Sequence, residues 1–183
     1  KEQKSQIDQQ IKGTSDFFKS RLQDDSGQTY LIAIDPYFWM RHAKNIIENG
    51  HPGDEIRDGQ PLDTHMFAPI GREIPPDMFH AYFEAYLFKF LSFFNSNLNL
   101  MKVAFYIPVL ISALSVIPAF FIARKIAGNF AGFIAGTIVA IHPSFLTRTI
   151  GGFSDTDAYN VMFPLFIAWL FIEALEAKNT KNT

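Results

Sequence analysis

The chain has 183 residues, 48% of them hydrophobic, and a formal net charge of -2. Without cysteine it has no disulfide scaffold, thiolate metal site or cysteine nucleophile, and without a clustered basic face we expect no binding to nucleic acid. Residues 1–100 hold 24 of the 34 charged side chains, so the two halves of the chain predict different environments.

Residues 1–30 form a polar N-terminal segment, in which Ile7–Leu22 has the pattern of a short amphipathic helix. Residues 31–100 are predicted to be a large extracytoplasmic loop with two helices. Asp35 is a favoured N-cap and Pro36 a favoured first helical residue, so the first helix is expected from Pro36 to about Asn49, ending at Gly50. Residues 51–77 are rich in Gly, Pro and Asp and are predicted to be loop.

The second helix of this loop is expected over Met78–Asn95, because aromatic and aliphatic residues recur there at helical spacing. Such an aromatic stripe favours two locations, the membrane interface and a contact with a partner domain. The sequence leaves both open.

Residues 101–177 are typical of a polytopic membrane protein. Val103 to Ala123 and Ile126 to Thr147 are uncharged runs of 21 and 22 residues, long enough as helices to cross a hydrocarbon core of about 30 Å. We expect transmembrane helices over residues 101–125, 126–147 and 158–177, followed by a cytoplasmic tail over residues 178–183. Arg124 and Lys125 lie in the predicted turn between the first two spans, and Lys178 and Lys181 lie in the tail. These basic residues place the turn and the tail inside, and therefore residues 1–100 and the acidic loop 148–157 outside.

Two further patterns accompany these spans. Gly128, Gly132 and Gly136 form a smooth face that predicts close helix packing. In the outer loop, Asp155 and Asp157 can converge on one cation such as Mg²⁺ or Mn²⁺. The alternative is that Asp157 caps the third span while Asp155 is solvated, and Asp35, on the same membrane face, has the alternative role of capping its own helix.

The order of these motifs resembles the catalytic subunit of oligosaccharyltransferase, most closely the archaeal single-subunit form, over about residues 31–177. The resemblance is carried by a first motif, a helical hairpin and a second motif: Asp35-Pro36-Tyr37-Phe38-Trp39-Met40-Arg41, then Arg148-Thr-x-Gly-Gly-Phe-x-Asp155-x-Asp157. It implies a mainly α, multi-pass enzyme of the cell membrane with the C-type glycosyltransferase fold and an extracytoplasmic active site. This family transfers an oligosaccharide from a dolichol phosphate or pyrophosphate carrier to Asn in Asn-x-Ser/Thr.

The resemblance also implies site residues. Asp35, Asp155 and Asp157 would hold Mn²⁺ or Mg²⁺, and Asp35, Asp155 and Arg148 would be the catalytic residues. Arg148 would orient the carboxylates or meet the phosphate, unless it is only an interfacial arginine with its head group in water. His80 resembles a histidine that contacts the carrier phosphate.

The chain also departs from the family pattern. It has fewer spans, and the family's Trp-Trp-Asp motif is absent, since Trp39 and Trp169 lie far apart. We therefore expect an N-terminal part of the enzyme that is inactive alone. Its partners would be the remainder of the enzyme, membrane lipid, lipid-linked oligosaccharide and an acceptor polypeptide. The alternatives are another lipid-linked-sugar transferase, a non-catalytic truncated paralogue that binds carrier lipid or partner subunits, and a transporter.

Overall fold

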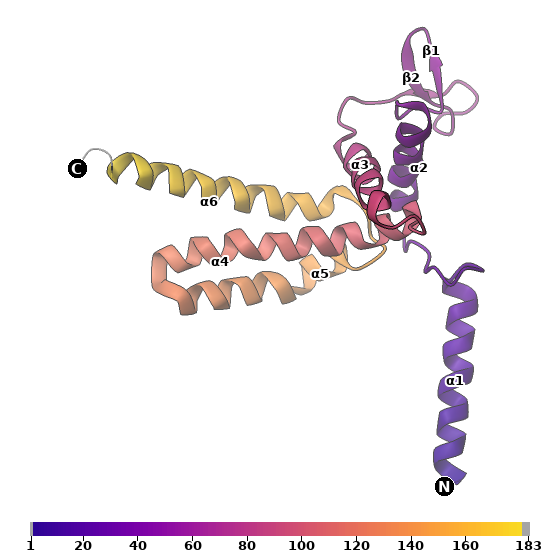
Figure 1. Cartoon of the computed structure of the whole chain (residues 1–183), viewed down its shortest axis with the longest axis horizontal. Helices are drawn as coiled ribbons and strands as arrows, with labels where there is room; N and C mark the ends of the chain where they lie inside the picture. Colours follow the sequence, from indigo (N-terminus) through magenta and orange to yellow (C-terminus); the bar gives the residue numbers. More distant parts are fainter. Residues whose placement is uncertain (1, 181–183) are drawn as a thin grey trace.

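The computed structural model describes residues 2–180, which are mainly helical. In chain order the elements are α1 (Glu2–Leu22), α2 (Ile34–Asn49), β1 (Glu55–Arg57), β2 (Gln60–Asp63), β3 (Arg72–Glu73), α3 (Phe79–Phe94), α4 (Leu100–Ile141), α5 (Pro143–Thr149), the 3₁₀ turn η1 (Thr156–Ala158) and α6 (Tyr159–Thr180). Figure 1 shows that α1 extends away from the rest of the chain and that α4, α5 and α6 lie side by side. Helices α2 and α3 and the strands lie at one end of these long helices. The N-terminal helix begins at Glu2, earlier than the predicted Ile7.

Helix α2 ends as predicted but begins differently. Gly50 terminates it in the left-handed conformation, with φ 81° and its N–H donating to the Ile46 carbonyl. At the other end Ala33 is the N-cap and no side chain caps the helix, so the predicted N-cap role of Asp35 is wrong. Asp35 instead lies in the first turn, where its negative charge interacts favourably with the helix dipole, and its side chain is exposed.

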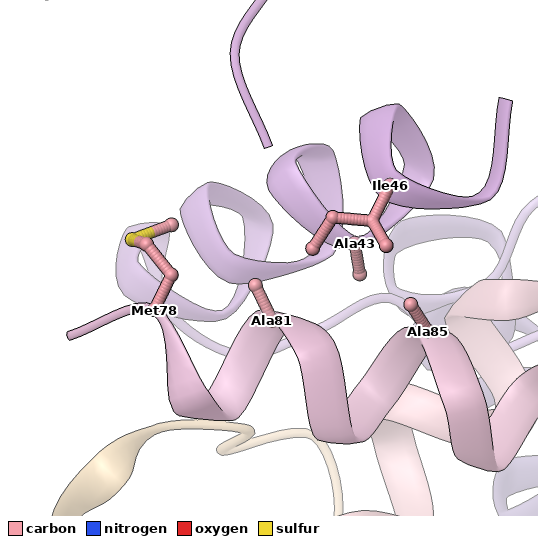
Figure 2. Packing of buried hydrophobic residues seen from close by; sticks show 5 residues of the cluster. All are labelled: Ala43, Ile46, Met78, Ala81 and Ala85. Atoms are coloured by element: carbon pink, nitrogen blue, oxygen red, sulfur yellow. The ribbon is translucent and has the colours of Figure 1, made fainter. Parts of the chain in front are cut away.

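Helices α2 and α3 pack together through small side chains. Figure 2 shows Ala43 and Ile46 of α2 facing Met78, Ala81 and Ala85 of the α3 segment, and all five are buried. The three alanines let the two helix backbones approach closely, which fixes α2 on α3. Because the aromatic side chains of α3 also pack on the beginning of α4, this pair of helices is held at one end of the long helices.

Residues 51–77 contain a small sheet where the sequence analysis expects only loop. Strands β1, β2 and β3 form an antiparallel meander in that order, with Glu55 opposite Leu62 and Leu62 opposite Glu73. Asp58 and Gly59 connect β1 to β2, both with positive φ. An Asp-Gly pair is a strong hairpin signal, so the sequence did carry this information.

Helix α4 consists of two arms that fold back on each other (Figure 1). The turn lies at Ala127 and Gly128, where Gly128 has φ 81°, and not at Arg124-Lys125 as predicted. Glycine adopts this left-handed conformation without the steric cost that other residues incur. The glycine face predicted for packing is therefore reduced to Gly132 and Gly136, whose Cβ atoms would lie 2.8 Å from the Phe120 carbonyl oxygen and 3.1 Å from the Val116 side chain.

Two helices in the described part of the chain are long and apolar enough to cross a membrane, α4 and the segment Thr156–Ala177. Helix α6 runs parallel to the first arm of α4. Tyr159 packs near Ile107 at one end, whereas at the other end Phe121 stacks on Trp169 and Lys125 pairs with Glu173 at 3.0 Å. Three helical segments thus lie where the sequence predicts three spans, but the second ends at Ile141 and the separate helix α5 begins at Pro143, so the predicted helix over residues 126–147 is interrupted. The boundaries of the spans against a membrane stay a prediction.

Candidate functional site

The acidic loop between α5 and η1 is fastened to two other parts of the chain. The Gly152 N–H donates to the Phe105 carbonyl at 2.9 Å, and the Gly152 carbonyl accepts from the Ile32 N–H at 3.2 Å. A Cβ atom on Gly151 would come within 2.5 Å of the Phe105 ring, so a larger residue there would require the ring to shift. These contacts bring the second motif of the sequence against the segment that leads into α2.

Asp155 is the point at which the two motifs meet. Its Oδ1 accepts a hydrogen bond from the Trp39 indole N–H on α2 at 2.9 Å and another from the Thr156 backbone N–H at 2.6 Å. Asp155 thereby caps η1, the turn that leads into α6, whereas the alternative in the sequence analysis left Asp155 solvated and had Asp157 cap the third span. All the hydrogen bonds that the structure records for this carboxylate end on Oδ1, so Oδ2 is available to a ligand.

Asp35 lies on the same face of α2 as Trp39, one turn earlier, because residues four apart are neighbours on a helix. The three predicted metal ligands nevertheless do not form a group whose oxygens all lie within 4.8 Å of one another. Within residues 2–180, only Asp54, Asp63 and His65 meet that spacing. The structure therefore places Asp155 against the helix of Asp35, and shared metal binding by Asp35, Asp155 and Asp157 stays a prediction.

Arg148 and Asp157 form an exposed ion pair beside this point. The guanidinium lies 3.3 Å from Asp157 Oδ2 and 5.4 Å from the Phe153 ring centre, and the Arg148 side chain is 60% exposed. A shallow groove runs along the pair and is lined also by His142, Phe145 and Val161. The arrangement suits the predicted role of Arg148 in orienting a carboxylate, and it leaves guanidinium N–H groups open to an anion.

His80 lies inside the fold. The side chain is fully buried, its Nδ1 is 2.9 Å from the Tyr159 hydroxyl, and its Nε2 is 3.1 Å from the Ser154 hydroxyl. Burial lowers the pKa of His80 to about 4, so the ring is neutral near pH 7. Both nitrogens have hydroxyl partners in this structure, and contact of His80 with the carrier phosphate stays a prediction.

Glu84 is a buried carboxyl group that the sequence analysis missed. It lies one turn after His80 on α3, with Oε2 3.9 Å from the His80 Nε2, and neither of its oxygens has a hydrogen-bond partner in the described chain. Burial raises the pKa of Glu84 to about 8, so the group is mostly protonated at pH 7. The four-residue spacing of His80 and Glu84 was the available signal, within an otherwise aromatic stripe.

Arg41 belongs to a separate ion cluster that ties the strands to α2. It pairs with Asp54 and, at 2.6 Å, with Asp63, which is 2% exposed. Burial alone would raise the pKa values of both carboxyls, but hydrogen bonds outweigh it and lower them: Asn45 and Arg41 act on Asp54, and Arg41 acts on Asp63. Arg41 offsets one of the two carboxylate charges, and its ion pairs make this group an anchor between the strands and α2.

Comparison with known proteins matches residues 7–182 to the family model described as oligosaccharyl transferase STT3, N-terminal. A dolichyl-phosphooligosaccharide-protein glycotransferase of Methanococcus voltae is 32% identical over 92% of this chain and 19% of its own length. The protein of the same name from Methanocaldococcus jannaschii is 33% identical over 90% of this chain and 18% of its own length. An undecaprenyl-diphosphooligosaccharide--protein glycotransferase of Campylobacter jejuni is 23% identical over 84% of this chain and 18% of its own length. The chain thus spans about a fifth of the length of these relatives.

Proposed function

Because this chain belongs to the oligosaccharyl transferase STT3 family, we propose that it forms the part of a membrane oligosaccharyltransferase that carries the outer carboxylates of the active site. The full enzyme would move an oligosaccharide from a dolichol phosphate or pyrophosphate carrier to Asn in Asn-x-Ser/Thr. The observation that carries the proposal is the hydrogen bond from Trp39 to Asp155, which joins two motifs 116 residues apart.

The proposed site fits a hard divalent cation by its donor set. Asp35, Asp155 and Asp157 offer only carboxylate oxygens, the ligands that Mg²⁺ and Mn²⁺ prefer. Asp35 is exposed, and Asp155 keeps Oδ2 available. When bound, the metal would neutralise charge on the phosphate that leaves the sugar.

The residues of this chain have proposed roles of their own. Asp155 and Asp35 hold negative charge at the site where the acceptor amide would come close, and Arg148 holds Asp157 while offering N–H donors to phosphate oxygens. The chain would cross the cell membrane several times, with α2, α3 and the acidic loop on the extracytoplasmic face. The basic residues Arg124 and Lys125 beside the turn of α4 support that orientation.

The test uses the complete enzyme with labelled lipid-linked oligosaccharide and a peptide containing Asn-x-Ser/Thr. We expect glycopeptide to form, to stop after EDTA treatment and to resume on addition of Mn²⁺ or Mg²⁺. A peptide with Gln in place of Asn is the matched control and should stay unmodified. Transfer that continues unchanged after complete metal removal would contradict the metal role, and no transfer under any condition would contradict the activity.

A further inference from the structure

We propose that Trp39 and His80 are positioning residues that hold the Asp155 carboxylate in one orientation, with Oδ1 fixed and Oδ2 presented to a divalent cation. The proposal rests on the proposed function, since it concerns how one carboxylate of that site is oriented. It assigns His80 a role inside the fold.

Trp39 acts directly on the carboxylate. Its indole N–H donates to Asp155 Oδ1 at 2.9 Å. The indole itself is held in place by edge-to-face contacts with Phe38 and His80, at ring-centre separations of 5.1 and 5.4 Å. Because these two contacts hold the indole ring, its N–H fixes the position of Oδ1 and restricts the rotamer of Asp155.

His80 acts on the residue that precedes Asp155. Its two nitrogens bridge the Ser154 hydroxyl in the loop and the Tyr159 hydroxyl at the start of α6. Ser154 and His80 are both fully buried, so water does not compete for these hydrogen bonds. A neutral ring donates from one nitrogen and accepts at the other, which matches two hydroxyl partners. The loop is thereby fixed at two consecutive residues, Ser154 by His80 and Asp155 by Trp39.

This arrangement has a consequence for metal affinity. A carboxylate on a loose loop loses rotamer freedom when it binds an ion, whereas a carboxylate that is already fixed does not. Removing groups that orient metal ligands costs about 10- to 100-fold in metal affinity in other proteins. We therefore expect the loss of either positioning contact to weaken metal binding while leaving the ligand oxygens themselves in place.

The decisive variant is Trp39→Phe in the complete enzyme, because it keeps an aromatic ring and removes the donor. We expect the Kd for Mn²⁺, measured by isothermal titration calorimetry, to rise about 10-fold. The Mn²⁺ concentration for half-maximal transfer should rise equally, and saturating Mn²⁺ should restore the transfer rate. The matched control is Trp169→Phe, which removes an indole hydrogen bond to Glu173 at 3.0 Å in the middle of α6 and should leave the Kd unchanged.

Ser154→Ala removes the contact between the loop and His80. It tests the positioning of Asp155 independently if the Trp39→Phe protein does not accumulate. It removes one hydroxyl, and we expect the Kd for Mn²⁺ to rise several-fold, in the direction seen with Trp39→Phe. Ser115→Ala is its control, because Ser115 is equally buried and bonds only within α4, to the Ile111 carbonyl at 2.8 Å. Wild-type Mn²⁺ affinity in both Trp39→Phe and Ser154→Ala would overturn the inference. Absence of Mn²⁺ binding by the wild-type enzyme would instead overturn the proposed function.

Discussion

Glu84 shows how a single residue of this fold responds to pH. Its carboxyl group is fully buried on α3, faces the neutral His80 and makes no hydrogen bond within the described chain. Burial raises its pKa from 4.5 to about 8. Between those values the folded protein keeps a proton that the unfolded chain releases, so the stability contributed by this group falls as the pH rises from about 4.5 to 8.

We therefore predict that Glu84→Gln, which stays neutral, reduces the loss of stability as the pH rises from about 4.5 to 8. The melting temperature of the wild-type protein in detergent should fall more between about pH 5 and pH 8.5 than that of the variant. Glu48→Gln, at an exposed position of α2, is the control and should keep the wild-type dependence. Equal pH dependence in wild type and Glu84→Gln would show that the buried carboxyl does not retain its proton.

The Arg41 cluster gives a second prediction at the scale of residues. Arg41→Ala would leave the buried Asp63 and its neighbour Asp54 without their cation, and we expect a loss of about 3 kcal/mol in the free energy of unfolding. The pKa values of both carboxyls are lowered in the fold, so the stability that they contribute is present above pH 3.8 and is lost as the pH falls further.

The control for that prediction is Arg57→Ala. Arg57 pairs with Glu55 on the exposed β1 strand, where an ion pair contributes about 1 kcal/mol or less. Denaturant unfolding at neutral pH compares the two variants. Equal losses in Arg41→Ala and Arg57→Ala would mean that the cluster does not anchor the strands to α2.

Local patterns identify some residues of the site and miss others for a clear physical reason. Asp35, Asp155 and Asp157 stand in short acidic or Asp-Pro motifs that can be seen in the sequence. Trp39 bonds to Asp155, and His80 bonds to Ser154 and Tyr159. These hydrogen bonds join residues 74 to 116 positions apart, which no local pattern encodes. For the same reason the burial of His80 became evident only from the fold.

At the scale of elements, the hairpin of α4 depends on two glycines that face its first arm. We predict that Gly132→Ala destabilises the hairpin by about 1 to 3 kcal/mol, because its Cβ would lie 2.8 Å from the Phe120 backbone oxygen and that atom has little room to move. The control is Gly13→Ala in α1, where a Cβ meets nothing within 4 Å. Thermal unfolding should show a loss for Gly132→Ala only, and equal melting temperatures would contradict the close approach.

The lengths of the apolar runs and the Gly50 helix end were predictable because each depends on residues close together in the sequence. The turn of α4 was misplaced by a few residues because basic residues were taken to mark it, whereas backbone conformation places it at Gly128. The sheet of β1 to β3 was missed because its strands have 2 to 4 residues each, too short for a clear alternation.

The whole molecule has α2, α3, the strands and the acidic loop at one end of its long helices and the turn of α4 at the other (Figure 1). We predict that these ends lie on opposite sides of the membrane. Because this chain has no cysteine, single cysteines introduced as Asn97→Cys and Asn129→Cys report on each end once cysteines elsewhere in the full protein are replaced. An impermeant maleimide applied from outside should label position 97, and position 129 only after the membrane is opened; the reverse result would contradict the orientation.

The account as a whole depends on Asp155, where the two motifs meet. Asp155→Asn in the complete enzyme keeps an oxygen that can accept the Trp39 hydrogen bond and removes the negative charge. The measurement is the rate of oligosaccharide transfer to an acceptor peptide, with Asp25→Asn at an exposed position as the control. We predict that Asp155→Asn accumulates normally and loses about 100-fold or more in turnover, whereas Asp25→Asn retains it. Wild-type turnover in Asp155→Asn would contradict the central role of this carboxylate.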